Sequence, residues 1–135
     1  MNHTTEIAQK DKTLLEVIKY EFEMLTFSVE KMRTITDQKE INIYLEVFLL
    51  HARNLICFLE AEGQKDDILI THFEDIHGES LEPIELGFDK DFKRKINKHC
   101  QHLSKERLNK KYGWKIAKIY NKIAAGIKKF YSQIQ

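Results

Sequence analysis

The sequence predicts an all-α protein: a four-helix bundle with a long connection between the second and third helices. Apolar residues recur at steps of three and four in four segments, as in amphipathic helices. Five glycines and one proline are too few for a protein of short strands and frequent turns. A hydrophobic fraction of 42% with 32% charged residues is typical of a soluble folded domain. Because 135 residues supply one hydrophobic core, we expect a single domain over residues 1–135.

The first two helices are predicted over residues 15–32 and 41–59. The apolar stripe of the first consists of Leu15, Ile18, Phe22, Leu25, Val29 and Met32. That of the second consists of Ile41, Leu45, Phe48, Ala52, Leu55 and Leu59. Asp37, followed three residues later by Glu40, has the spacing of a helix N-cap and predicts where the second helix begins.

The third and fourth helices are predicted over residues 92–103 and 116–134. Asp89 is the expected cap of the third helix, and Gly113 separates the third from the fourth. Short links within each pair favour two antiparallel hairpins. Residues 63–87 form the long connection, which contains the only proline, and residues 66–76 are expected to add one short helix.

The second helix is apolar on almost every side. Between residues 41 and 59 its only charged side chains, with His51 counted as neutral, are Glu46 and Arg53. Such a helix is buried on more than one side. Either it is the central helix of the bundle, or its back face meets a second protomer, and we therefore expect a homodimer.

Charge is strongly segregated along the chain despite a net charge of +1. Residues 1–89 contain 19 acidic and 8 basic side chains, whereas residues 90–135 contain 2 acidic and 14 basic ones. The basic half includes a stripe on the fourth helix, formed by Lys111, Lys115, Lys118, Lys122 and Lys129. With Tyr112 and Trp114 at its start, this stripe favours RNA or an acidic protein surface as partner. A membrane surface, a plain solvated face and neutralisation by the acidic half are the alternatives.

A metal site is conceivable in the third helix, although no metal or other cofactor is the expected outcome. His99, His102 and Glu106 follow at steps of three and four and share one stripe, which suits zinc, nickel or iron. A further ligand would come from elsewhere, the candidate donors being His51, Glu46, His72, Glu74, Asp75 and His77. The alternative is that His99 lies at the edge of the core and His102 faces solvent.

Arg53 lies on the buried second helix, where a lone charge is costly and needs a partner. We expect a structural ion pair between Glu46 and Arg53, with Glu60 as a further acid on that side. In the functional alternative, Arg53 binds phosphate through its guanidinium group. His51 or His102 would then supply acid–base chemistry, so that His51, Arg53, His99 and His102 are the catalytic candidates.

The two cysteines, Cys57 and Cys100, form no CxxC motif and suggest a reducing compartment. The N-terminal residues lack the pattern of a signal peptide. No apolar run approaches the length of a membrane span, and Val47–Leu50 is one of the densest apolar patches. We expect a cytoplasmic protein without a membrane span.

Three stretches together resemble a family of small, helical, largely uncharacterised bacterial proteins. The motifs are HARNL at residues 51–55, KDD at residues 65–67 and HLSKER at residues 102–107. The resemblance covers roughly residues 40–110 and implies the same helical fold. The chain departs from the family pattern at Cys57, where an acidic residue is usual, and near His72, where a second aspartate is usual.

A looser, partial similarity is to HEPN domains, helical bundles that often act on RNA through an arginine, a polar residue and a following histidine. Arg53-Asn54 has the beginning of that motif, and Arg94 with His99 has its spacing. The similarity implies a metal-independent endoribonuclease as an alternative to a helical interaction module that binds RNA or an acidic partner through its lysine-rich helix. A metal-binding bundle protein is the third alternative.

Overall fold

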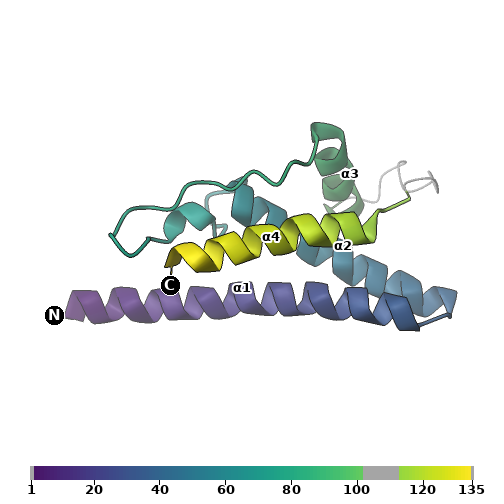
Figure 1. The fold of residues 1–135 in the computed structure, drawn as a ribbon, viewed down its shortest axis with the longest axis horizontal. Helices are drawn as coiled ribbons and strands as arrows, with labels where there is room; N and C mark the ends of the chain where they lie inside the picture. Colours follow the sequence, from purple (N-terminus) through teal and green to yellow (C-terminus); the bar gives the residue numbers. More distant parts are fainter. Residues whose placement is uncertain (1, 102–112, 135) are drawn as a thin grey trace.

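The protein is an all-α, four-helix arrangement, seen in a computed structural model that describes residues 2–101 and 113–134, with side chains from residue 12 to 100 and from 113 to 134. The helices are α1 (Asn2–Thr34), α2 (Gln38–Glu60), α3 (Lys90–Gln101) and α4 (Ile116–Ile134) (Figure 1). A single short 3-10 turn, η1 (Ile70–His72), lies in the connection. The predicted fold class is confirmed.

The hairpin of α1 and α2 turns at three residues, 35–37. Asp37 ends the turn: its Oδ2 accepts the Glu40 amide at 3.0 Å, so the predicted N-cap is confirmed. α1 has 33 residues and begins well before the predicted start at residue 15. Residues 2–14 contain neither glycine nor proline to interrupt the helix, although their apolar periodicity is weak.

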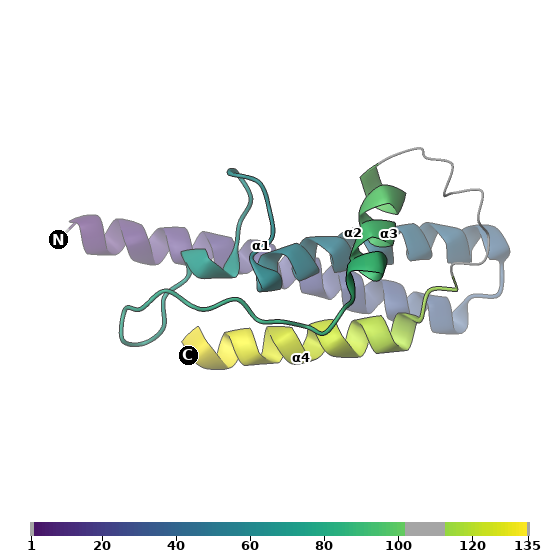
Figure 2. The same cartoon turned by 90° about the horizontal axis from the view of Figure 1, so that it is seen from above.

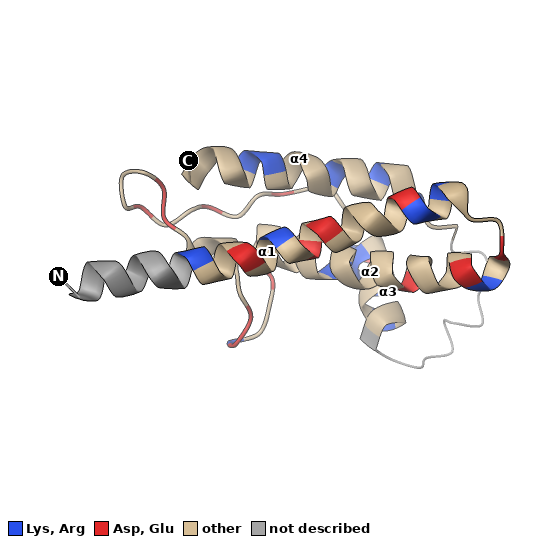
Figure 3. Cartoon of the chain, turned by 90° about the horizontal axis from the view of Figure 1, so that it is seen from below, with Lys and Arg blue, Asp and Glu red and all other residues tan. Residues whose placement is uncertain are grey.

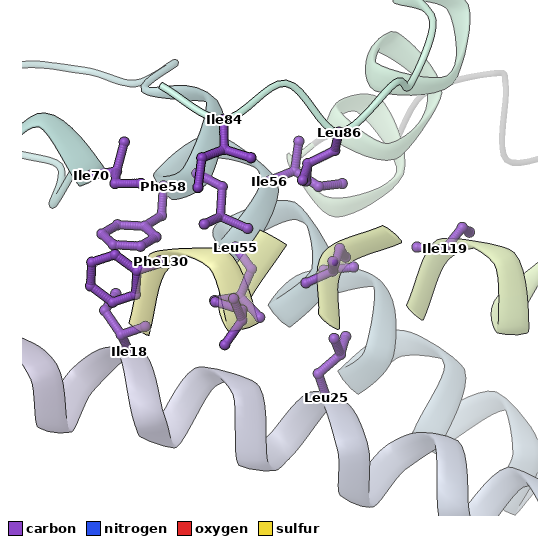
Figure 4. Close-up of a cluster of buried hydrophobic side chains, with 14 of the residues drawn as sticks. Ile18, Leu25, Leu55, Ile56, Phe58, Ile70, Ile84, Leu86, Ile119 and Phe130 are labelled. Carbon is purple, nitrogen blue, oxygen red and sulfur yellow. The ribbon is translucent and has the colours of Figure 1, made fainter. Parts of the chain in front are cut away.

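α2 is the central helix of the bundle. It contacts α1, α3, α4 and η1, and its buried side chains include Phe48, Leu49, Leu55 and Leu59. These meet residues of α1 and α4 in one hydrophobic cluster (Figure 4). Ile43 and Leu50 nevertheless stay exposed, so part of its back face has no partner within the described residues.

Among the described helices, α2 alone is long and apolar enough to cross a membrane when judged by length and composition. A core helix of a water-soluble bundle meets that criterion equally well. The expectation of no membrane span therefore stays a prediction.

The connection from residue 61 to 89 is bound to the bundle along its second half, which runs beside α4 (Figure 2). Leu81, Ile84 and Leu86 are buried in the main core. The Ile84 amide donates to the Leu59 carbonyl at 2.7 Å, and the Leu86 amide donates to Glu60 Oε2 at 3.0 Å. The short helix predicted within residues 66–76 is present as η1.

Gly126 of α4 lets the connection approach closely. A Cβ atom at this position would lie 2.7 Å from Leu86 Cδ2 and 2.9 Å from Leu59 Cδ1. Both leucines are buried and have little room to move. The absence of a side chain at residue 126 therefore brings α2, α4 and the connection into contact.

α3 lies crosswise to the three long helices (Figures 1 and 2). Asp89 Oδ1 accepts the Phe92 amide at 2.7 Å, so the predicted cap of α3 is confirmed. Lys93 Nζ donates to Glu60 Oε1 and to Glu62 Oε1, each at 2.9 Å. These two ion pairs hold α3 against the end of α2.

Replacing Gly126 by valine is expected to lower the free energy of unfolding by about 1–3 kcal/mol, because the added methyl groups overpack the contact with Leu59 and Leu86. Urea unfolding followed by circular dichroism measures the change. The matched control is Ala125→Val at the neighbouring exposed position, where we expect only the helix-propensity cost of about 0.7 kcal/mol or less. Equal losses in the two variants would contradict the close contact.

Candidate functional site

A cleft of about 370 Å³ lies between the beginning of α3 and the beginning of α4. The end of the connection and the first residues of α3 form one wall, and residues 113–122 form the other. Its charged side chains are Asp89, Asp91, Lys95, Lys115, Lys118 and Lys122. Its aromatic side chains are Phe88, Phe92 and Trp114.

The aromatic side chains of the cleft contact one another in a row that runs from Phe88 through Phe92 to Trp114. The rings of Phe88 and Phe92 are stacked with centroids 4.6 Å apart, and Trp114 meets Phe92 edge to face at 6.1 Å. The imidazole ring of His99 meets Trp114 edge to face, with ring centroids 5.7 Å apart. These contacts fix Trp114, which is half-buried, at the point where residues 113–115 lead into α4.

The two acids of the cleft already have partners. Asp89 caps α3, and Asp91 accepts from Lys95 Nζ and Arg94 Nη2, both at 3.0 Å. The hydrogen bond from Lys95, followed by that from Arg94, lowers the pKa of Asp91 below its ordinary value. The Asp91 carboxylate therefore remains ionised at neutral pH.

The lysines of the cleft differ in their surroundings. Lys122 Nζ donates to the Gly87 carbonyl at 2.8 Å and lies 4.9 Å from the Phe88 ring centroid. Lys115 and Lys118 are exposed, and neither has a hydrogen-bond or ion-pair partner among the described side chains. Of the four lysines of the cleft, Lys122 thus holds the wall and Lys95 pairs with Asp91, whereas Lys115 and Lys118 are available to an anion.

The predicted lysine stripe is only partly within the described residues. Lys129 lies further along α4 and is exposed, whereas Lys111 lies outside the described residues. Within the part of the chain described, no lysine of α4 forms an ion pair with a carboxylate. Figure 3 shows that the charged residues of α4 are all basic, whereas α1 carries both acidic and basic residues. Direct neutralisation of this stripe by paired acids is thus not observed.

The predicted ion pair between Glu46 and Arg53 is wrong. Glu46 Oε1 pairs with His99 Nε2 at 3.0 Å, and Arg53 Nε donates to Asn97 Oδ1 at 3.1 Å. Both partners belong to α3, which packs against α2 at these positions. Seven residues along a helix correspond to about 10.5 Å of rise, so a neighbouring helix offers each side chain a nearer partner.

Cys57 lies beside Arg53 and is half-buried. Burial raises the pKa of its thiol, and the nearby Arg53 opposes this only in part. The thiol therefore stays protonated at neutral pH.

His51 belongs to a polar cluster that the sequence did not predict. Its Nδ1 contacts Glu21 Oε2 of α1, and Asn54 Nδ2 donates to the other oxygen of the same carboxylate at 2.5 Å. Tyr20 packs edge to face on the imidazole with ring centroids 5.9 Å apart. Glu21 lies one position before Phe22 of the apolar stripe, and this position is the only feature of the sequence that places it near the core.

The catalytic candidates are not brought together within the described residues. His51 binds α1, Arg53 binds Asn97 of α3, and His99 binds Glu46. Arg94, the other arginine of the HEPN-type spacing, pairs with Asp91. His102 lies outside the described residues.

The expected metal ligands are likewise dispersed where they are described. No group of three or more His, Cys, Asp or Glu side chains in that part of the chain has the geometry to hold a metal ion. Asp75 accepts the His77 and Glu79 amides of its own loop at 2.8 and 3.0 Å, and His72 Nδ1 accepts the Leu69 amide at 3.2 Å. His102 and Glu106, two members of the candidate triad, lie outside the described residues.

Comparison of this chain with models of protein families, with curated proteins and with solved structures finds no match.

Replacing Glu21 by alanine is expected to lower the free energy of unfolding by about 2–3 kcal/mol, because His51 and Asn54 both lose a charged hydrogen-bond partner. Chemical denaturation measures the loss. Glu23→Ala is the matched control on the same helix: its carboxylate is exposed and 3.9 Å from Lys19, and we expect a change below about 0.5 kcal/mol. A Glu21 variant as stable as the control would contradict a stabilising role for the cluster.

Proposed function

We propose that this protein is a helical binding module that takes a segment of single-stranded RNA in the cleft between α3 and α4. The observation that carries the proposal is the position of two exposed ammonium groups, Lys115 and Lys118, beside the half-buried Trp114; neither has a partner among the described side chains. Phosphates and bases are the two parts of a nucleic acid that such groups bind.

The lysines would contact the phosphate backbone. Exposed ammonium groups bind phosphates as point charges and release condensed counterions, which gives much of the affinity of nucleic-acid binding proteins. Lys118 and Lys129 lie on the same side of α4, so the positive surface continues along the helix beyond the cleft. A strand that enters the cleft can therefore follow α4 toward its C-terminal end.

The aromatic wall favours a nucleic acid over an acidic protein. Bases of a single strand can stack on an indole ring, whereas bases of a duplex are already stacked on each other. An acidic protein would use the lysines but has no need of Trp114. A cytoplasmic location, favoured by the two free cysteines, would give the module access to RNA.

A metal-independent ribonuclease is the alternative function. In this case a histidine would act as base on a ribose hydroxyl while an arginine bound the phosphate. Arg53 and His99 lie on facing helices, but each is bound to another side chain. Analysis of the RNA after incubation with the protein in chelator distinguishes binding from cleavage.

The double variant Lys115→Glu/Lys118→Glu is expected to bind a short unstructured RNA at least about tenfold more weakly at low ionic strength. Two lost phosphate contacts also reduce the slope of log affinity against log salt by about 1.4, since each contact on a single strand contributes about 0.7. Fluorescence anisotropy of labelled RNA over a salt series measures both quantities. We leave Lys122 unchanged because it holds Gly87.

Lys128→Glu is the matched control, an exposed lysine of the same helix outside the stripe, and it should lose much less affinity. Trp114→Ala serves as the second arm. Loss of one stacked base should weaken RNA binding by about 1–3 kcal/mol while leaving retention of an acidic polypeptide unchanged. Absence of RNA binding by the wild-type protein, or equal losses in the Lys128 variant, would refute the proposal.

A further inference from the structure

An apolar surface remains uncovered on the α1–α2 hairpin, away from the cleft. We call it the hairpin face and define it by Val17, Tyr20, Met24 and Phe27 of α1 and Ile43, Val47 and Leu50 of α2. Ile43 is 59% exposed and Tyr20 is 55% exposed. Val17, Phe27 and Leu50 are each exposed by more than 40%. Contiguous apolar patches of this kind commonly mark interaction sites.

The two stripes of the hairpin face are neighbours in space. Phe27 of α1 meets Tyr44 of α2 with ring centroids 5.9 Å apart, and Tyr20 meets His51 at the same distance. The Glu21 cluster adjoins the Tyr20–His51 contact and also joins the two helices. These contacts also fix the register of the hairpin: Met24 lies level with Val47 and Phe48.

We propose that a second copy of this chain covers the hairpin face, with α1 against α1 and α2 against α2 in antiparallel orientation. The two-fold axis would pass near Met24 of α1 and between Val47 and Leu50 of α2. A copy fits this face better than another protein because each stripe holds a pair of like residues, Tyr20 with Phe27 on α1 and Val47 with Leu50 on α2, and the two pairs are centred within about one residue of the same level of the hairpin. A two-fold interface requires this self-complementarity.

On α1, the antiparallel register places Tyr20 opposite Phe27 of the partner subunit. On α2, the same axis places Val47 opposite Leu50 of the partner subunit. The hairpin register puts the two midpoints within about one residue of the same height, so a single axis passes close to both. The resulting layer of four antiparallel helices is a common packing arrangement.

The charges beside the hairpin face are complementary in this register. Lys31 lies over the Phe27 ring, 5.4 Å from its centroid, at one end of the α1 stripe. Glu16 is exposed at the other end. The antiparallel axis places Lys31 opposite Glu16 of the partner subunit, and this pair occurs twice in the dimer.

Other partners fit the hairpin face less well. The seven residues that define the hairpin face are all uncharged and offer RNA no phosphate contact. An anionic membrane surface would gain no net attraction, because the basic residues of α1 are balanced by its acidic ones. A second copy meets neither obstacle.

The test is the oligomeric state in sedimentation velocity and equilibrium experiments. Wild-type protein should be a dimer at tens of micromolar concentration, and Leu50→Glu should weaken dimerisation at least about a hundredfold while keeping its helical circular dichroism. Ile76→Glu is the matched control, since Ile76 is 73% exposed but lies in the connection, and it should remain dimeric. A monomeric wild type, or a Leu50 variant as dimeric as the control, would overturn the proposal.

The register is tested by charge reversal. Glu16→Lys and Lys31→Glu should each weaken the dimer, and the double variant should regain most of the lost affinity because each pair forms again with reversed signs. A double variant that is weaker than both singles would overturn the antiparallel register. Binding of the wild-type monomer to neutral or anionic phospholipid vesicles, with loss of binding in Leu50→Glu, would assign the face to a membrane and overturn the dimer.

Discussion

The contact among Leu59 of α2, Leu86 of the connection and Gly126 of α4 determines much of this structure. It is possible because Gly126 has no side chain, so α4 and the connection approach each other over α2. Hydrogen bonds from the Ile84 and Leu86 amides to residues 59 and 60 fix the connection in place. The long connection is therefore part of the hydrophobic core rather than a loop outside it.

The cleft follows from that contact. Immediately after Leu86, the carbonyl of Gly87 receives Lys122, and the next residues stack Phe88 on Phe92 at the beginning of α3. The connection thus delivers its last residues to the beginning of α4, where Trp114, Lys115 and Lys118 complete the cleft. Because no described lysine of α4 is neutralised by an ion pair, the segregated charge of the sequence persists at the surface of the folded protein. The hairpin face lies apart from this surface, so RNA binding and dimerisation can be tested separately.

The long helices were predictable because their periodicity directly reflects which side is buried. The caps at Asp37 and Asp89 were predictable for the same local reason: a carboxylate bonds an amide three residues away. Contacts between side chains of different helices were not predictable from the sequence. Glu21 gave no signal as the partner of His51, and the supposed Glu46–Arg53 pair failed because α3 supplies nearer partners. The buried part of the connection was also missed, since Leu81, Ile84 and Leu86 have no helical or strand period.

Hydrogen exchange at the amides of Ile84 and Leu86 tests most directly whether the connection is a fixed part of the fold. Both amides are bonded to the end of α2, so we expect them to exchange as slowly as the interior amides of α4, while the exposed loop at residues 65–66 exchanges fast. Backbone NMR or mass spectrometry with residue resolution supplies the rates. Exchange at Ile84 and Leu86 as fast as that of the exposed loop would contradict the account, because the connection could then not position the cleft.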